Sequence, residues 1–141
     1  MKVSVQKEDF DLSAEIRSFS GNGKVGVIAS FVGVVREVPM TLEHYAGMTE
    51  NAIRKIVDEA HSRWQLIDSA VIHRYGELKP GEQIVMVAVA SSHRGDAFAA
   101  CEFIMDYLKT RAPFWKKEHR AGGATWVEAR TTDDQAAERW K

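Results

Sequence analysis

Cationic side chains are crowded into one short segment of the sequence. Residues 109–120 read Lys-Thr-Arg-Ala-Pro-Phe-Trp-Lys-Lys-Glu-His-Arg, in which a single acid accompanies five cations: Lys109, Arg111, Lys116, Lys117 and Arg120. Two interpretations stay open, a solvated basic loop after a helix or a site for an anion. The neighbouring aromatic rings would fix the lysines by packing, and a partly buried lysine among like charges can lose its proton and act as a base or nucleophile.

Two further cationic sites lie where structural elements are expected to end. Ser91-Ser92-His93-Arg94 follows an apolar run and precedes a helical pattern. Backbone N–H groups at a helix N-terminus bind anions and an arginine adds bidentate capacity, although a helix cap with a surface ion pair would explain the same residues. Arg36 ends a long apolar run, where it either lines a site or marks the point at which a strand reaches water. The three cationic regions together favour a small anionic ligand, such as a phosphate ester.

The remaining reactive side chains give weaker signals. His44 and His73 fall within expected strands and are interpreted as structural residues. No two histidines have the spacing of helical metal ligands, so no metal site and no cofactor are predicted. Cys101 is the only cysteine and lies on the apolar stripe of a helix, which predicts a core residue and excludes an internal disulfide. Chemistry would therefore depend on lysine and histidine.

Strands and helices alternate along the chain. Hydrophobic periodicity predicts strands at 3–5, 24–36, 41–45, 69–75, 83–91 and 125–130, and helices near 12–19, at 50–64, at 96–109 and from 132 onward. The near-continuous apolar run 24–36 indicates a strand buried on both faces. Lys79-Pro80-Gly81-Glu82 predicts a turn that joins strands 69–75 and 83–91 as a hairpin. We expect a single α+β domain over residues 1–141, with a mixed, mostly antiparallel sheet and two main helices.

Composition restricts the class of protein. The chain has 141 residues, 45% of them hydrophobic, and a formal net charge of −1, which argues against a protein that coats nucleic acid and against a disordered acidic chain. The N-terminal residues lack the apolar core of a signal peptide. The longest apolar run, 25–35, is shorter than the roughly 20 residues of a membrane span. We therefore expect a cytoplasmic protein without membrane or nucleic-acid partners.

Seven short segments carry a resemblance to a known family. They are 29–36 (ASFVGVVR), 42–48 (LEHYAGM), 71–78 (VIHRYGEL), 91–94 (SSHR), 103–109 (FIMDYLK), 112–118 (APFWKKE) and 126–130 (WVEAR). The combination of Lys-x-x-Ala-Pro-Phe-Trp-Lys with the upstream Ser-His-Arg is specific, whereas each segment alone is not. On these residues the chain resembles the large, catalytic subunits of molybdopterin synthases, which have an α/β hammerhead fold.

The resemblance implies a reaction and its partners. The family converts cyclic pyranopterin monophosphate into molybdopterin by adding two sulfur atoms. The sulfur arrives as a thiocarboxylate on the C-terminal Gly-Gly of a small ubiquitin-like subunit, which would explain why no catalytic cysteine is evident. A central homodimer of large subunits carries one small subunit at each end, so the resemblance implies a heterotetramer and a sulfurtransferase that acts in molybdenum cofactor biosynthesis.

The resemblance also implies roles for individual residues. Lys109 and Lys116 match the two essential lysines, of which Lys109 is expected to contact the thiocarboxylate or act as an acid or base. The positions that match substrate-binding residues are Arg36, His93 and Arg94 for the phosphate and pterin, Phe31 and Met105 for the pocket wall, and Arg130, which is expected to act from the other large subunit.

One departure from the family pattern concerns the loop after Arg36. Only five residues separate Arg36 from Leu42, where many family members carry a longer polar loop.

The alternative functions are a non-catalytic dimeric receptor for a ubiquitin-like tail and an RNA-binding domain. A tail receptor needs only one carboxylate site, and RNA binding favours aromatic residues along a basic stripe. The several cationic sites therefore favour the enzyme.

Overall fold

The computed structural model describes residues 1–19, 23–127 and 131–141. Two long helices and a series of strands alternate along the chain, which confirms the predicted α+β class. The strands divide between two four-stranded sheets, whereas the sequence pattern predicts a single mixed sheet. The division creates a junction between two sheets, which local sequence patterns do not predict.

The first sheet has the strand order β1-β4-β6-β2. Its central strands, β4 (Leu66–Arg74) and β6 (Gln83–Ser91), form the predicted antiparallel hairpin. On the outside, β1 (Lys2–Gln6) runs parallel to β4, and β2 (Val27–Val34) runs antiparallel to β6. This sheet is therefore mixed and mostly antiparallel, as expected.

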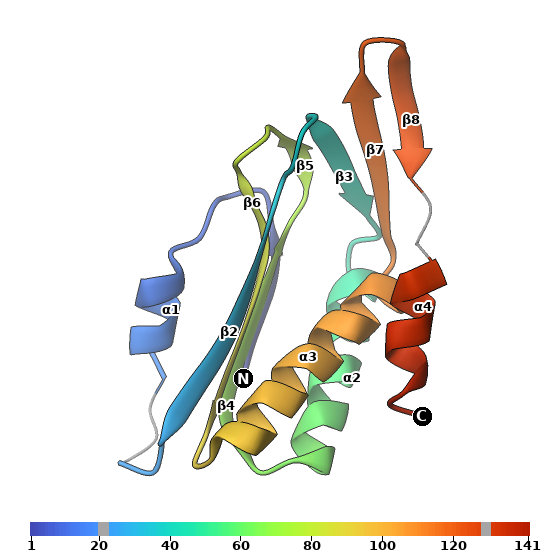
Figure 1. Ribbon diagram of the computed structural model, residues 1–141. Coiled ribbons are helices and arrows are strands. Elements are labelled where there is room, and N and C mark those ends of the chain that lie inside the picture. The colour runs from blue at the N-terminus through green and yellow to red at the C-terminus, as the bar shows by residue number, and fades with distance from the viewer. Residues whose placement is uncertain (20–22, 128–130) are drawn as a thin grey trace.

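Helices bury both faces of the two central strands (Figure 1). Helices α2 (Met48–Arg63) and α3 (Arg94–Thr110) cover one face, where Val71, Val87 and Val89 belong to the main core. The short helix α1 (Leu12–Arg17) lies on the other face, over a second cluster that includes Ile72 and Met86. Alternate residues of one strand thus enter opposite cores, because successive side chains of a strand point to opposite faces.

Strand β2 is not buried on both faces, and that prediction is wrong. It forms an edge of the sheet, so Phe31 and Val34 remain 41% and 49% exposed. Glycine at position 33 permits a close approach to β6, because a Cβ there would lie 2.9 Å from Cγ1 of Val85. The pairing with β6 shifts register between Gly33 and Val34, which indicates a bulge. An apolar run therefore indicated a strand but not its place in the sheet.

The second sheet has the order β5-β3-β7-β8 and is antiparallel throughout. Its strands are β5 (Gly76–Leu78), β3 (Met40–His44), β7 (Phe114–Arg120) and β8 (Gly123–Val127). The β7–β8 hairpin extends beyond the body of the molecule in Figure 1. Strand β7 corrects the loop interpretation of the cationic segment, and β5 was not expected from the sequence.

The C-terminal helix packs beside α3. Helix α4 (Thr131–Glu138) follows the second sheet, and the ring of Trp140 lies 5.6 Å from those of Trp64 and Phe103. Aromatic pairs at such separations add to the stability gained from burial alone. None of the described helices combines the length and the apolar character needed to cross a membrane.

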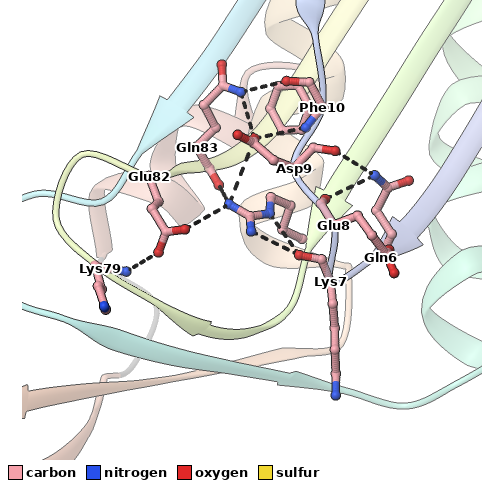
Figure 2. Close-up of polar contacts among 9 residues, drawn as sticks. Gln6, Lys7, Glu8, Asp9, Phe10, Lys79, Glu82 and Gln83 are labelled. Atoms are coloured by element: carbon pink, nitrogen blue, oxygen red, sulfur yellow. Dashed lines mark hydrogen bonds and ion pairs between the residues drawn. The ribbon is translucent and has the colours of Figure 1, made fainter.

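A buried guanidinium fastens the end of β4 to two neighbouring segments. Arg74 donates hydrogen bonds to the carbonyl oxygen of Lys7 from both Nε and Nη2, each at 3.0 Å, and from Nη1 to that of Gln83 at 2.9 Å. The carboxylates of Asp9 and Glu82 lie 3.9 and 3.8 Å from Nη1. Figure 2 shows how Lys7, Asp9, Glu82 and Gln83 converge on this point. One cation thus ties the N-terminal segment to the β4–β6 hairpin.

Replacement of this guanidinium should destabilise the fold measurably. We expect Arg74→Met to lower the free energy of unfolding by about 2–4 kcal/mol, because buried carbonyl oxygens lose charged hydrogen-bond donors. Exposed Arg54, whose Nη1 donates to the side chain of Asn51, allows the same chemical change, and Arg54→Met should cost less than about 0.5 kcal/mol. Urea denaturation of both variants measures the difference, and equal stabilities would contradict the assigned role.

Candidate functional site

A cavity of about 530 Å³ lies where the two sheets meet the C-terminal end of α3. Strands β2 and β6 of the first sheet, strands β3 and β7 of the second, and the last turns of α3 contribute to its wall. The lining includes five residues that the sequence analysis proposed for the site: Phe31, Arg36, Met105, Lys109 and Lys116. Side chains that are distant in sequence therefore converge on one cavity.

The two candidate lysines reach the cavity from consecutive elements. Lys109 lies in the last turn of α3, which ends at Thr110. Proline disfavours helical geometry in the residue before it, and Pro113 accordingly separates α3 from β7. Lys116 then lies within β7, opposite Leu42 of β3 and Val127 of β8. The reversal between helix and strand brings both lysines to the same cavity.

Successive side chains of β7 point to opposite faces, so the cations of this strand lie on two different surfaces. Lys116, Glu118 and Arg120 line the cavity, since they share one face of the strand. On the opposite face, Nζ of Lys117 lies 5.1 Å from the centroid of the Trp126 ring. Arg111 points elsewhere: Nη1 lies 3.3 Å from the carboxylate of Glu59. The cationic segment is therefore not one uniform basic surface.

Tight local geometry holds the backbone at Arg36. The preceding residue, Val35, is buried and makes two backbone hydrogen bonds with the turn before β6: its N–H donates to Glu82 and its carbonyl accepts from Gly81, both at 2.9 Å. Just after Arg36, the N–H of Val38 donates to the Arg36 carbonyl at 2.9 Å, and Glu37 has φ 70°. This is a three-residue turn, a strained conformation for a residue other than glycine.

The residues His93 and Arg94 do not reach this cavity within one chain. They lie at the N-terminus of α3, whereas Lys109 lies in its last turn. At about 1.5 Å per residue, the 15 steps from Arg94 to Lys109 span about 22 Å. His93 occupies the N-cap position without a side-chain cap hydrogen bond, and both side chains are exposed. Arg130 lies outside the described residues.

His73 lines the cavity, although its strand position suggested only a structural role. The ring stacks on Phe114 with centroids 3.7 Å apart, and Nδ1 lies 2.9 Å from the carbonyl oxygen of Arg74. The pKa of His73 is lowered to about 4, mainly by burial and also by the charges of Lys109, Lys116 and His44, while the backbone hydrogen bond acts in the opposite direction. The imidazole is therefore neutral at pH 7.

The single cysteine is a core residue, as predicted. Cys101 is buried in the main cluster and does not contribute to the cavity wall. Burial raises the pKa of its thiol to about 11, so the nucleophilic thiolate is disfavoured. Among the described residues, no three His, Cys, Asp or Glu side chains gather in a group that could hold a metal ion.

The cavity combines cations with apolar surfaces. The cationic residues of its lining are Arg36, Lys109, Lys116 and Arg120. The acidic ones are Glu37, Glu118 and Asp133. Glu118 is engaged by Arg120, with Oε2 and Nη2 2.7 Å apart. Phe31, Met105 and Phe114 supply apolar wall. This arrangement suits an anionic ligand that also carries a flat ring, because cations bind the charge and aromatic side chains contact ring faces.

Comparisons with known proteins identify the family. The family model described as MoaE protein matches residues 5–111. A molybdopterin synthase catalytic subunit from Ralstonia nicotianae is 59% identical over 146 aligned positions, which cover 98% of this chain and 83% of that protein. These matches confirm the resemblance that the sequence motifs indicated.

Solved structures agree with the sequence matches. A MoaE protein from Burkholderia ambifaria has a TM-score of 0.86 and 57% identity, over 99% of this chain and 97% of that one. Molybdopterin synthase from Staphylococcus aureus has a TM-score of 0.81 and 32% identity, over 88% of this chain and 95% of that one. The shared fold and the family match over most of the sequence show that this chain belongs to the MoaE protein family.

Proposed function

We propose that this chain is the catalytic subunit of a molybdopterin synthase. It transfers sulfur from the C-terminal thiocarboxylate of a small ubiquitin-like subunit to cyclic pyranopterin monophosphate in the cytoplasm, and so forms the dithiolene of molybdopterin. The observation that carries the proposal is the convergence of Arg36, Lys109 and Lys116 on one cavity. The reaction is inferred from the family, and the charged residues of the cavity are chemically suited to it.

The cavity matches the chemistry of such a substrate. Arg36 can bind phosphate oxygens bidentately, and the two lysines add positive charge beside it. Addition of sulfur expels oxygen groups and opens a cyclic phosphate, so negative charge develops on the substrate. Cations already fixed around the reacting atoms stabilise that charge without reorganisation. Lys109 and Lys116 accordingly serve as the catalytic residues, while Phe31 and Met105 contact the pterin.

The sulfur nucleophile comes from outside this chain in the proposed reaction. Cys101 is buried away from the cavity, and the raised pKa keeps its thiol protonated. A thiocarboxylate on the tail of a partner supplies an ionised sulfur at neutral pH and requires no cysteine here. The binding partner in this proposal is the small ubiquitin-like carrier that the family resemblance implies, whose C-terminus would reach the cavity.

A second copy of the chain would complete the site. His93 and Arg94 match substrate-binding positions of the family, but α3 holds them about 22 Å along the helix from Lys109 of the same chain. A homodimer can bring the N-terminus of α3 from one copy to the cavity of the other. In a two-fold symmetric dimer this contact occurs twice, so each cavity would receive His93 and Arg94 from the opposite copy. We infer the same cross-subunit role for Arg130.

Removal of either cavity lysine should stop the reaction. We expect Lys109→Ala and Lys116→Ala to lower single-turnover conversion by about 100-fold or more, because acid–base and electrostatic contributions are lost. Lys117→Ala is the matched control: it lies next to Lys116 but on the opposite face of β7, and should stay within about threefold of wild type. Purified chain, thiocarboxylated partner and cyclic pterin are mixed, and the dithiolene is measured after oxidation to its fluorescent derivative.

The same assay separates the enzyme from the alternative receptor. Full activity of Lys109→Ala would contradict the assigned catalytic role. If wild-type chain binds the partner tightly but yields no product, a non-catalytic receptor for a ubiquitin-like tail is the better description, and the short loop after Arg36 becomes the first feature to examine.

Mixed dimers test whether the site spans two copies. Lys109→Ala and Arg94→Ala should each be nearly inactive alone. If the two variants are coexpressed in equal amounts, half of the dimers contain one chain of each kind. In such a mixed dimer, one of the two sites combines an intact Lys109 with an intact Arg94, so about a quarter of wild-type activity should return. The fluorescent dithiolene assay measures the recovery. Activity that stays at the level of the single variants would show that both residues act within one chain.

A further inference from the structure

His73 lies in the cavity wall, and one of its two ring nitrogens has no hydrogen-bond partner among the described residues. The residue is 9% exposed and lines the same cavity as Lys109 and Lys116. One ring face stacks on Phe114, with an interplanar angle of 18°. In the part of the chain that the structure describes, the hydrogen bond of this ring is made by Nδ1, and none is found at Nε2. Nε2 is therefore available to an occupant of the cavity.

The contact at Nδ1 fixes the tautomer of the ring. A carbonyl oxygen only accepts hydrogen bonds, so Nδ1, which lies 2.9 Å from the Arg74 carbonyl, must carry the proton and donate. In the neutral ring, Nε2 then has no proton and presents its lone pair. Protonation of Nε2 is opposed by burial and by the nearby charges of Lys109 from α3, Lys116 from β7 and His44 from β3.

This acceptor differs from the other polar groups of the cavity. The remaining polar side chains among its described lining residues are arginine, lysine, glutamate and aspartate. Arginine and lysine are donors only, and carboxylates bring negative charge close to a phosphate. His73 is thus the neutral acceptor, and the stack on Phe114 holds the direction of its lone pair. A fixed acceptor binds a matching donor at little cost in side-chain entropy.

We propose that His73 is a substrate-binding residue whose Nε2 accepts a hydrogen bond from an N–H group of the pterin ring. The inference rests on the proposed function, since it assigns a contact to the same substrate. Pterin rings carry N–H donors, and the cations of the cavity cannot pair with them. The phosphate would bind the cations, and His73 would orient the ring.

Three substitutions separate the two ring nitrogens. His73→Asn retains a donor near Nδ1 and removes the acceptor at Nε2. His73→Gln places an amide oxygen near the position of Nε2. His73→Phe retains the stacking surface without either nitrogen. We expect His73→Asn and His73→Phe to raise KM for the cyclic pterin roughly tenfold while kcat changes less than about threefold, and His73→Gln to restore KM to within about threefold of wild type.

The outcomes distinguish this inference from the proposed function. Wild-type KM in His73→Asn, or an equal defect in His73→Gln and His73→Asn, would overturn the binding role while wild-type turnover still supports the enzyme. A wild-type chain that neither binds nor converts the pterin would overturn both.

Nitrogen NMR of the wild-type chain tests the contact without any substitution. With ¹⁵N-labelled histidine, Nε2 of His73 should show the signal of an unprotonated nitrogen at pH 7. Addition of the cyclic pterin should shift this signal as the lone pair accepts a hydrogen bond. A protonated Nε2, or a signal unchanged under saturating pterin that is turned over normally, would contradict the inference.

Discussion

The buried guanidinium of Arg74 holds the point where one sheet passes into the other. Strand β4 ends at Arg74 in the first sheet, and β5 begins at Gly76 in the second, with φ 91° at that glycine. The hydrogen bonds from Arg74 to the carbonyls of Lys7 and Gln83 prevent this corner from opening. His73, its immediate neighbour, forms part of the cavity wall and donates to the Arg74 carbonyl. The cavity therefore depends on the same corner that joins the two sheets.

Local patterns predicted the elements whose neighbours are close in sequence. The two long helices and the β4–β6 hairpin follow from apolar period and from a Pro-Gly turn. Strand β7 escaped prediction because its residues after Phe114 and Trp115 are polar on both faces, so no alternation of apolar and polar residues marks it. Its partners, β3 and β8, and the cavity together supply the environment that makes the segment a strand. The edge position of β2 was equally invisible, since it depends on which strands lie beside it.

The candidate site was predictable only in part, because some of its residues are brought to the cavity by contacts between segments that are distant in sequence. Lys109, Lys116 and Arg36 emerged because cations crowd near aromatic residues or end an apolar run, and the family resemblance gave them roles. His73 gave no such signal: a histidine in an apolar strand is ordinarily a structural residue, and only the long-range contact with Phe114 reveals its position in the cavity. Its place in the segment 71–78, which carries part of the resemblance, was the one available indication.

The short loop after Arg36 is compatible with a place for this residue in the cavity wall. Five residues must turn the chain from Arg36 into β3, and Glu37 adopts φ 70° to achieve this. A left-handed conformation costs about 1–3 kcal/mol for such a residue, and persists only where the surroundings hold it. The paired hydrogen bonds of Val35 with Gly81 and Glu82 provide that support on one side, and β3 provides it on the other. The backbone on both sides of Arg36 is thus held at the sheet junction, and a loop of five residues is enough to keep this cation in the cavity wall. In the proposed reaction, this position lets Arg36 bind the phosphate.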